Sequence, residues 1–216
     1  MTTLRSDARR NREKILAAAS ELFAQRGAEA SVSDIARLAG VGHATVFRRF
    51  PTKESLLLAL LEQRVEALSA VAEEALAHED AFEGLRAAMA YMAESQARDR
   101  GFFEAVGTEF IGSDSLRAAR DRALAAFAAL LRRAQDTGQV RDDLEPQDVM
   151  FLISAAGHAG PCRIDLPGLS GRYLGVILDG MRPEGASPLA PPAPSLAEID
   201  AALEALTEPP AAASSS

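Results

Sequence analysis

The segment 43–49, His-Ala-Thr-Val-Phe-Arg-Arg, constrains the fold of this chain more than any other stretch. The turn-forming sequence Gly40-Val41-Gly42 precedes it, and Phe50-Pro51 follows it directly. Glycine adopts turn conformations readily, whereas proline lacks an amide hydrogen and disfavours helical geometry in the residue before it. The segment is therefore predicted to form a separate short helix. Thr52 is expected to cap a new, long helix that begins at Lys53.

The residues before this segment predict two more helices that pack against it. Between 9 and 26, apolar residues recur with helical spacing, and Gly27 provides a stop. Ser31 and Asp34 have the spacing of a capping box, so a short helix is expected over 32–39. The side chains expected to face inward are Ile35, Leu38, Val41, Val46 and Phe50, and those expected on the outer surface are His43, Ala44, Thr45, Phe47 and Arg48.

The whole chain is predicted to be all-α. Hydrophobic residues make up 48% of it, much of this fraction is the helix former alanine, and β-branched residues form no alternating runs. Further helices are expected over 53–77, 80–99, 101–111, 114–137, 145–159 and 168–181. We divide the chain into a helix-turn-helix head at 1–53, a helical body at 54–183, and a Pro- and Ala-rich tail at 184–216. The tail is expected to contain a short capped helix at 195–206 and a disordered end.

Charge is distributed unevenly along the sequence. Residues 1–53 contain ten Lys or Arg and five Asp or Glu, a net charge of +5, so the remainder carries −13 of the total of −8. A basic module joined to an acidic body is typical of a protein that binds a polyanion, and chance clustering is the competing explanation. Within the head, the first residues form either a basic arm near the polyanion or a disordered end that carries Arg5, Arg9 and Arg10.

The sequence contains no known catalytic or cofactor-binding motif. The three histidines, His43, His78 and His158, are scattered, and no HExxH, GxSxG, CxxC or glycine-rich phosphate loop occurs. We therefore expect no enzymatic activity, metal or cofactor. The single cysteine, Cys162, excludes an intramolecular disulfide, and its redox role stays open. A charged N-terminus without an apolar segment, and the lack of any long apolar run, predict a cytoplasmic protein with no membrane span.

Two short helices joined by a glycine-containing turn and braced by a preceding helix form a helix-turn-helix. The second helix of such a unit enters the major groove of DNA, where small or polar side chains fit close to base edges and arginines reach phosphates. The stretches "REKILAAASELFAQRG", "SVSDIARLAGV" and "ATVFRRFPTKESLLLAL" resemble the tetracycline-repressor (TetR) family of bacterial transcription regulators. The resemblance covers about residues 9–60, and 171–183 is similar to the final helix of many members. It implies a two-fold homodimer that binds a double-stranded DNA operator and that a small molecule releases.

The resemblance also implies roles for individual residues. Phe47 takes a position that is usually tyrosine, so its contact with DNA is expected to be apolar, and Gly42 replaces a more usual serine cap. Lys53, at the start of its helix, is expected to meet a phosphate with help from the helix dipole. The implied DNA-binding set is Ser33, Gly42, His43, Ala44, Thr45, Phe47, Arg48, Arg49 and Lys53.

Apolar residues of the body are predicted to serve mainly as core. Flexible methionines and aromatic side chains also suit an adaptable ligand pocket, and the candidates for lining one are Met89, Met92, Phe103, Phe110, Phe127 and His158. Apolar stripes on 145–159 and 168–181 form either intramolecular core or, as the resemblance favours, a four-helix bundle across a two-fold axis. The stripes consist of Val149, Leu152, Ile153, Ala156 and Ala159, and of Leu169, Tyr173, Leu174, Ile177, Leu178 and Met181.

Together these patterns favour a ligand-responsive, DNA-binding transcriptional regulator. The expected form is a repressor that a small-molecule effector releases from a palindromic operator. The alternative is a helical small-molecule-binding protein or enzyme whose basic head makes protein contacts. No motif identifies the effector, the operator, the regulated genes or the sign of regulation.

Overall fold

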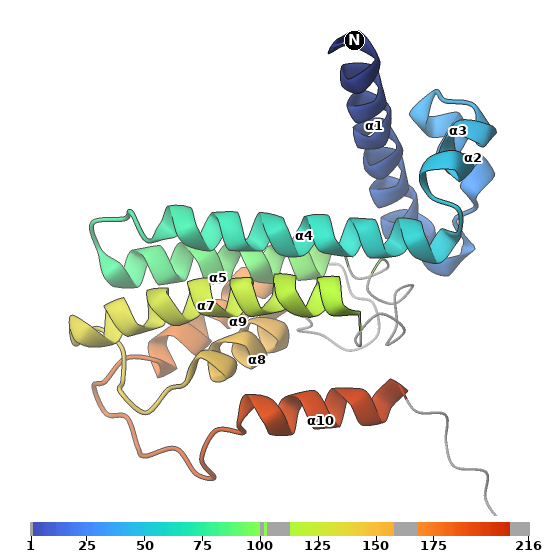
Figure 1. Cartoon of the computed structure of the whole chain (residues 1–216). Coiled ribbons are helices and arrows are strands. Elements are labelled where there is room, and N and C mark those ends of the chain that lie inside the picture. Colours follow the sequence, from blue (N-terminus) through green and yellow to red (C-terminus); the bar gives the residue numbers. More distant parts are fainter. Residues whose placement is uncertain (1, 100–101, 103–112, 158–167, 208–216) are drawn as a thin grey trace, which may run out of the picture.

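A computed structural model describes residues 2–99, 102, 113–157 and 168–207 of the chain. Every regular element in these ranges is a helix, which confirms the predicted all-α fold. Figure 1 shows α1 standing upright beside α2 and α3 at one end of the molecule, and a layered bundle of longer helices at the other. A single helix, α4, runs from the first part into the second.

The head consists of α1 (Thr2–Arg26), the 3₁₀ helix η1 (Gly27–Glu29), α2 (Val32–Ala39), α3 (His43–Arg49) and the first turns of α4 (Lys53–Ala75). The short elements α2 and α3 have the bounds that the sequence predicted. The long α4 ends two residues before the predicted end at 77.

The predicted start of the first helix at residue 9 is wrong, because α1 already begins at Thr2. Arg10 forms an ion pair with Asp7, and Arg9 forms one with Glu13 at 3.5 Å. Pairs three or four residues apart lie side by side on a helix surface and stabilise it. The first residues therefore extend α1, so the alternative of a disordered end is wrong, and a basic segment near the polyanion stays a prediction.

An apolar core holds the head together. Phe23 of α1, Ile35 of α2, Val46 of α3 and Leu56 of α4 are fully buried in it. Leu38, which the sequence predicted to face inward, is 47% exposed. The short α2 turns only one narrow face toward its neighbours, and the residues on that face are Ile35, Ala36 and Ala39.

A capping box starts α4, and Thr52 is the cap that the sequence predicted. Thr52 Oγ1 accepts a hydrogen bond from the Ser55 amide at 3.1 Å, and Ser55 Oγ accepts one from the Thr52 amide at 3.2 Å. These bonds satisfy amides that have no partner within the helix. The next two turns of α4, up to Leu61, still pack into the head core, so the head extends past the proposed boundary at 53.

In the body, α5 (Ala81–Arg98) and α7 (Asp114–Asp136) pack against α4, and α8 (Pro146–Gly157) and α9 (Leu169–Gly180) pack on α5. In Figure 1, α4, α5 and α7 run side by side, with α8 and α9 on the opposite side of α5 from α4. The helix predicted over 101–111 lies outside the described residues, except for the helical and buried Phe102. No described helix has the length and apolar character needed to cross a membrane.

Most residues of the two predicted dimer stripes are buried in the subunit's own core. This is a correction of the dimer-bundle interpretation for Val149, Ile153, Ala156, Leu174, Leu178 and Met181. The helices α8 and α9 pack on α5 and on each other, and these side chains fill the space between them. Three large side chains point outward instead: Phe151, Tyr173 and Val176 are 54%, 47% and 67% exposed. Ala159 lies outside the described residues.

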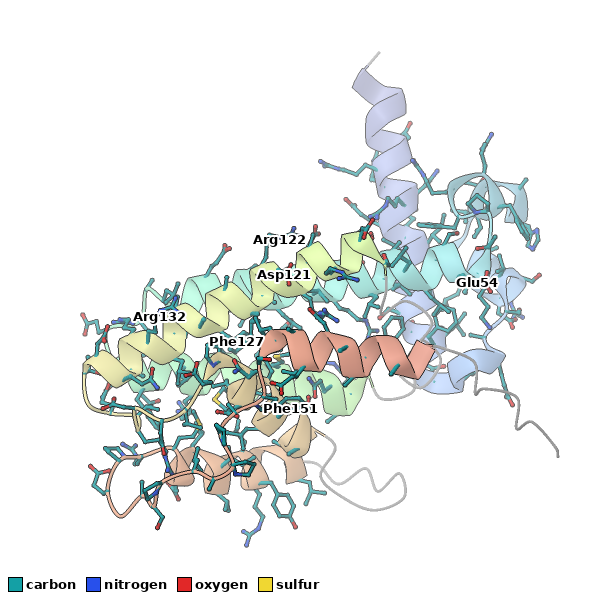
Figure 2. All side chains as sticks on the ribbon, turned by 60° about the horizontal axis from the view of Figure 1, so that its bottom comes forward. Glu54, Asp121, Arg122, Phe127, Arg132 and Phe151 are labelled. Carbon is teal, nitrogen blue, oxygen red and sulfur yellow. The ribbon has the colours of Figure 1, made fainter. Side chains whose placement is uncertain are left out.

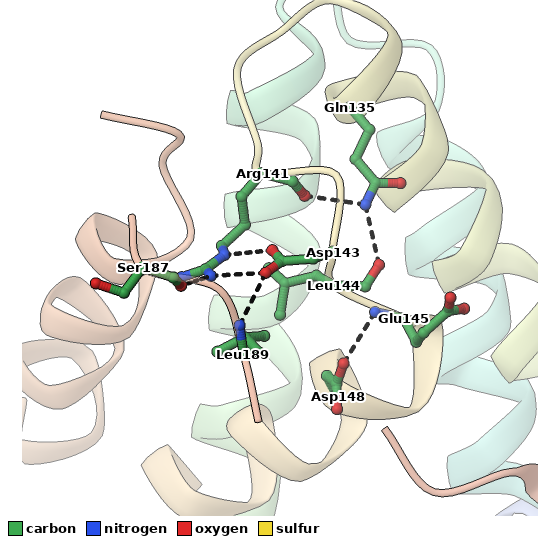
Figure 3. A network of polar contacts seen from close by, with 8 residues as sticks. All are labelled: Gln135, Arg141, Asp143, Leu144, Glu145, Asp148, Ser187 and Leu189. Atoms are coloured by element: carbon green, nitrogen blue, oxygen red, sulfur yellow. Dashed lines mark hydrogen bonds and ion pairs between the residues drawn. The ribbon is translucent and has the colours of Figure 1, made fainter. Parts of the chain in front are cut away.

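The segment 181–195, which connects α9 to the last described helix, is called the strap here and packs against the body. The Arg141 guanidinium pairs with Asp143 and donates to the carbonyl of Ser187, while the Leu189 amide donates to Asp143 Oδ2 at 3.1 Å (Figure 3). Gln135 Nε2 donates to the carbonyls of Arg141 and Leu144 and so supports the same turn. The strap is therefore held to the loop between α7 and α8.

The strap leads into α10 (Leu196–Thr207), close to the predicted range 195–206. Its predicted capping box is present: Ser195 Oγ accepts from the Glu198 amide at 3.3 Å, and Glu198 Oε2 accepts from the Ser195 amide at 2.8 Å. An ion pair of 2.7 Å joins Asp200 to Arg120 of α7. The predicted disordered end, 208–216, lies outside the described residues.

Replacing Ile35 with Ala removes a fully buried side chain from the head core, so we expect the free energy of unfolding to fall by about 2–5 kcal/mol. Leu38→Ala, the matched change on the same helix, should alter it by no more than about 0.5 kcal/mol, because Leu38 is exposed. Urea denaturation followed by circular dichroism measures both. Equal costs for the two variants would contradict the outward position of Leu38.

The Arg141 guanidinium and the Leu189 amide hold the pKa of Asp143 far below its usual 3.8. Because folding lowers this pKa, the carboxylate stabilises the fold above its unfolded pKa, and this contribution is lost as the pH falls through the folded pKa. We expect Asp143→Asn to lower the melting temperature at about pH 6, and the difference from wild type to shrink as the pH drops below about 4. Thermal denaturation across this range tests it; a difference that grows on acidification contradicts it.

Candidate nucleic-acid interface

A local network around Asp34 sets the start of α2. Ser31 Oγ accepts a hydrogen bond from the Asp34 amide at 3.1 Å and donates one to the Asp34 carboxylate at 2.8 Å. Arg37 pairs with the same carboxylate, and Arg26 at the end of α1 approaches it to 3.4 Å. The Ser31 hydroxyl, followed by the two arginines, lowers the pKa of Asp34. Arg26 thus joins α1 to α2, and Arg37 stabilises the first turns of α2 itself.

Two glycines shape the turn between α2 and α3. Gly40 ends α2 with φ at +65°, in the left-handed region that glycine enters without steric cost. The Val41 amide donates to the Ala36 carbonyl at 3.1 Å, and the Thr45 amide donates to the Gly42 carbonyl at 2.8 Å. A Cβ at Gly42 would meet only Thr45 Oγ1, at 3.8 Å, so a serine cap would fit there.

The inner side of α3 fixes its rotation about its own axis. Val46 is fully buried, Phe50 is 6% exposed, and Val41 in the turn is half-buried, as the sequence predicted. With these side chains anchored, the opposite side must face outward. The exposed residues of that side are His43, Ala44, Phe47, Arg48 and Arg49, and Thr45 is half-buried. This is the orientation expected of a helix that reads DNA.

An aromatic pair occupies the outer face of α3. The His43 and Phe47 rings lie with their centroids 4.7 Å apart and their planes at 57°. Phe47 keeps 44% of its surface exposed, although the head core lies directly behind it. The face therefore combines an imidazole, an apolar ring and the exposed Arg48 and Arg49, which together can hydrogen-bond base edges, contact a thymine methyl and neutralise phosphates.

The remaining predicted DNA contacts lie on the neighbouring helices. Ser33 is exposed in the first turn of α2. Lys53 is half-buried in the first turn of α4, with Nζ 5.5 Å from the centroid of the Phe23 ring. Its ammonium group thus lies over a ring of the head core. The exposed Glu54, labelled in Figure 2, follows Lys53. A hydrogen bond from its own backbone amide, in the first turn of α4, lowers the pKa of the Glu54 carboxyl.

The predicted ligand-binding residues divide into two groups. Met89, Met92 and Phe127 lie together in the body core, each at most 5% exposed. Phe103, Phe110 and His158 lie outside the described residues. In the part of the chain that the structure describes, no group of three or more His, Cys, Asp or Glu side chains gathers as a metal site would need.

Sequence reasoning missed a cavity of about 350 Å³ between α1, α4 and α5. Its polar lining includes Arg64, Tyr91, Ser95 and Arg98. The only sequence signal was the interruption of the apolar pattern of α4 by Gln63 and Arg64, which reads equally well as a solvated surface.

The comparisons with known proteins agree with this geometry. A model described as "Bacterial regulatory proteins, tetR family" matches residues 15–60, and one described as "Transcriptional regulator SbtR-like, C-terminal domain" matches 80–183. No protein with a curated description matches the chain.

Solved structures extend the likeness over about four fifths of the chain. A TetR transcription regulatory protein from Mycobacterium vanbaalenii is 35% identical, with a TM-score of 0.64 over 83% of this chain and 99% of that one. The TetR regulator SCO0520 from Streptomyces coelicolor is 30% identical, with a TM-score of 0.65 over 81% of this chain and 99% of that one. The TetR-family regulator PfmR from Thermus thermophilus is 26% identical, with a TM-score of 0.59 over 79% of this chain and 97% of that one.

These likenesses decide between the two functions that the sequence left open. The enzymatic alternative is wrong, because the matched proteins are transcription regulators. Since two of them are covered almost completely at 30% identity or more, this chain belongs to the TetR family of transcriptional regulators.

Proposed function

We propose that this protein is a repressor that binds a two-half-site DNA operator as a homodimer and leaves it when a small molecule binds. The observation that carries the proposal is the orientation of α3: Val46 and Phe50 are buried, so that His43, Phe47 and Arg48 face outward. Because the target is DNA, the proposed place of action is the cytoplasm.

The outer face of α3 supports a division of roles among its residues. His43, Thr45 and Arg48 supply hydrogen-bonding groups for base edges, and Phe47 supplies an apolar surface for a thymine methyl or a sugar. The small Gly42 and Ala44 allow close approach to the groove. Phosphate contacts fall to the flanking polar and basic residues, which are Ser33, Arg49 and Lys53.

The outward faces of α8 and α9 support dimerisation. Phe151, Tyr173 and Val176 keep about half or more of their surface exposed there. Large exposed apolar side chains on neighbouring helices mark protein–protein contact surfaces. A second copy related by a two-fold axis would bury these faces in a four-helix arrangement and place two α3 helices at a fixed spacing.

Release of the protein from DNA follows if the effector has different affinities for two arrangements of the heads. Met89, Met92 and Phe127 are the proposed contacts of an effector in the body core, where flexible and aromatic side chains can repack around it. An effector that binds better when the two heads are wrongly spaced removes the protein from DNA. The continuous α4 connects the body to the head, so a shift of the body changes that spacing.

Selection of bound duplexes from a random pool tests the function. We expect a palindromic consensus with two half-sites about one helical turn apart. Lys53→Ala should weaken binding to the consensus and to unrelated DNA about equally, and should lower the slope of log affinity against log salt by about one. Fluorescence anisotropy across a salt titration measures both effects. An unchanged slope rejects Lys53 as a phosphate contact, and a pool with no enriched sequence rejects the function.

The variant Val176→Asp places a charge on the proposed dimer face, where Val176 is 67% exposed. We expect it to shift the protein toward the monomer and to weaken operator binding by at least about tenfold, because a single head contacts only one half-site. Leu189→Asp, at a 47% exposed position on the strap, is the control and should leave the dimer intact. Analytical ultracentrifugation reads the assembly state; a Val176→Asp dimer as stable as wild type contradicts this interface.

A further inference from the structure

The joint between head and body, residues 62–68 of α4, differs in burial from the helix on either side of it. The helix α4 is buried in the head core up to Leu61 and in the body from Ser69 onward. Between these positions no α4 side chain is buried. In this stretch Val65 packs half-buried on the head core and Leu68 half-buried on the body core, and the cavity of about 350 Å³ lies beside them.

Arg64 of α4 holds this joint together. Its guanidinium forms an ion pair of 2.7 Å with Asp99 at the end of α5 and donates to Ser20 Oγ of α1 at 3.0 Å. It also lies 3.8 Å from the centroid of the Phe102 ring, which packs edge-on against Phe23 of the head. Both charges of the pair are almost enclosed, with 13% and 14% of their side chains exposed. One side chain thus contacts α1, the end of α5 and the segment beyond it.

Two arginines and two carboxylates line the cavity beside Arg64: Arg64, Arg98, Glu13 and Asp99. Asp99 is already engaged by Arg64, and Glu13 at the rim pairs with Arg9 at 3.5 Å. Arg98 also lines the cavity, and among the described residues no carboxylate lies within ion-pair distance of it. Burial lowers the pKa of Arg64, and the negative charge of Asp99 opposes this shift. The positive charge of Arg98 lowers the same pKa further, because the two guanidinium groups repel each other.

The other walls of the cavity supply hydroxyl groups and apolar surface. Tyr91 and Ser95 of α5 line it beside Arg98. Leu16 of α1 and Leu60 and Leu68 of α4 line it as well. A volume of this size, with apolar walls and a few converging polar groups, is typical of small-molecule sites.

We propose that this joint cavity binds a small organic carboxylate with an apolar body. The carboxylate accepts hydrogen bonds from Arg98 and from the hydroxyls of Ser95 and Tyr91, and it competes with Asp99 for Arg64. The apolar body lies against the leucines of α1 and α4. This site is separate from the proposed effector site among Met89, Met92 and Phe127 in the body core.

Binding here would control the position of the head. The cavity has α1 on one side and α5 on the other, so a carboxylate that draws Arg64 from Asp99 loosens the ion pair that ties α5 to the joint. A ligand that binds the loosened arrangement better must weaken DNA binding by the same factor. This step, unlike the binding site itself, rests on the proposed DNA-binding function.

Calorimetric titration of the full-length protein tests the site without DNA. The probes are octanoate and benzoate, and the uncharged controls are octanamide and benzamide. We expect the acids to bind at least about tenfold more tightly than their amides, because charge-assisted hydrogen bonds are the stronger ones. The variant Arg98→Gln should weaken acid binding about tenfold. Arg132→Gln, an exposed position on α7 labelled in Figure 2, should leave it unchanged.

Three outcomes overturn the site: no heat from either acid, equal binding of acids and amides, or equal binding to wild type and Arg98→Gln. Because Arg98 is exposed, its replacement leaves the fold intact, and circular dichroism verifies this. Fluorescence anisotropy with a selected duplex then tests the coupling, with operator affinity expected to fall about tenfold in saturating octanoate. Acid binding with unchanged operator affinity overturns the control of the head but keeps the site. Failure to bind any duplex in the absence of acid overturns the proposed function instead.

Discussion

The structure depends on one continuous helix that is packed into two separate apolar cores. Leu56 and Leu60 of α4 belong to the head core, and Ala72 of the same helix belongs to the body core. A helix of 23 residues is stiff over roughly 35 Å, because every interior amide is bonded within it. The orientation of the head is therefore tied to the packing of α4 against α5 and α7. A signal in the body therefore needs no flexible linker to reach the head.

In the proposed mechanism, the polar joint is the place at which head and body move relative to each other. Apolar cores resist displacement because every shift opens voids or forces overlaps. A joint held by the Arg64–Asp99 pair, with a cavity beside it, resists less. The uneven charge favours one orientation of the protein toward DNA. DNA repels the acidic remainder of the chain and attracts the basic head.

Local hydrogen bonding explains which features could be predicted. The caps Thr52 with Ser55 and Ser195 with Glu198 lie within four residues of each other, so helix starts could be found without knowing the fold. The outward face of α3 could be predicted because Val46 and Phe50 lie four residues apart and Val41 of the preceding turn joins them on one side. The inward position predicted for Leu38 is wrong because, on a helix of eight residues, more than one face satisfies the same spacing.

The sequence by itself determined the helices, the short recognition segment between two turns, and the concentration of basic residues in the head. Those properties arise from propensity, capping and charge within a few residues, which no distant contact needs to supply. Only the tertiary structure decided that the stripes of α8 and α9 lie in the subunit's own core, leaving Phe151 and Val176 outside. It also decided that Ser20, Arg64 and Asp99 meet at one joint. Burial and ion pairing depend on which distant segments share a space, and spacing along the chain does not carry that information.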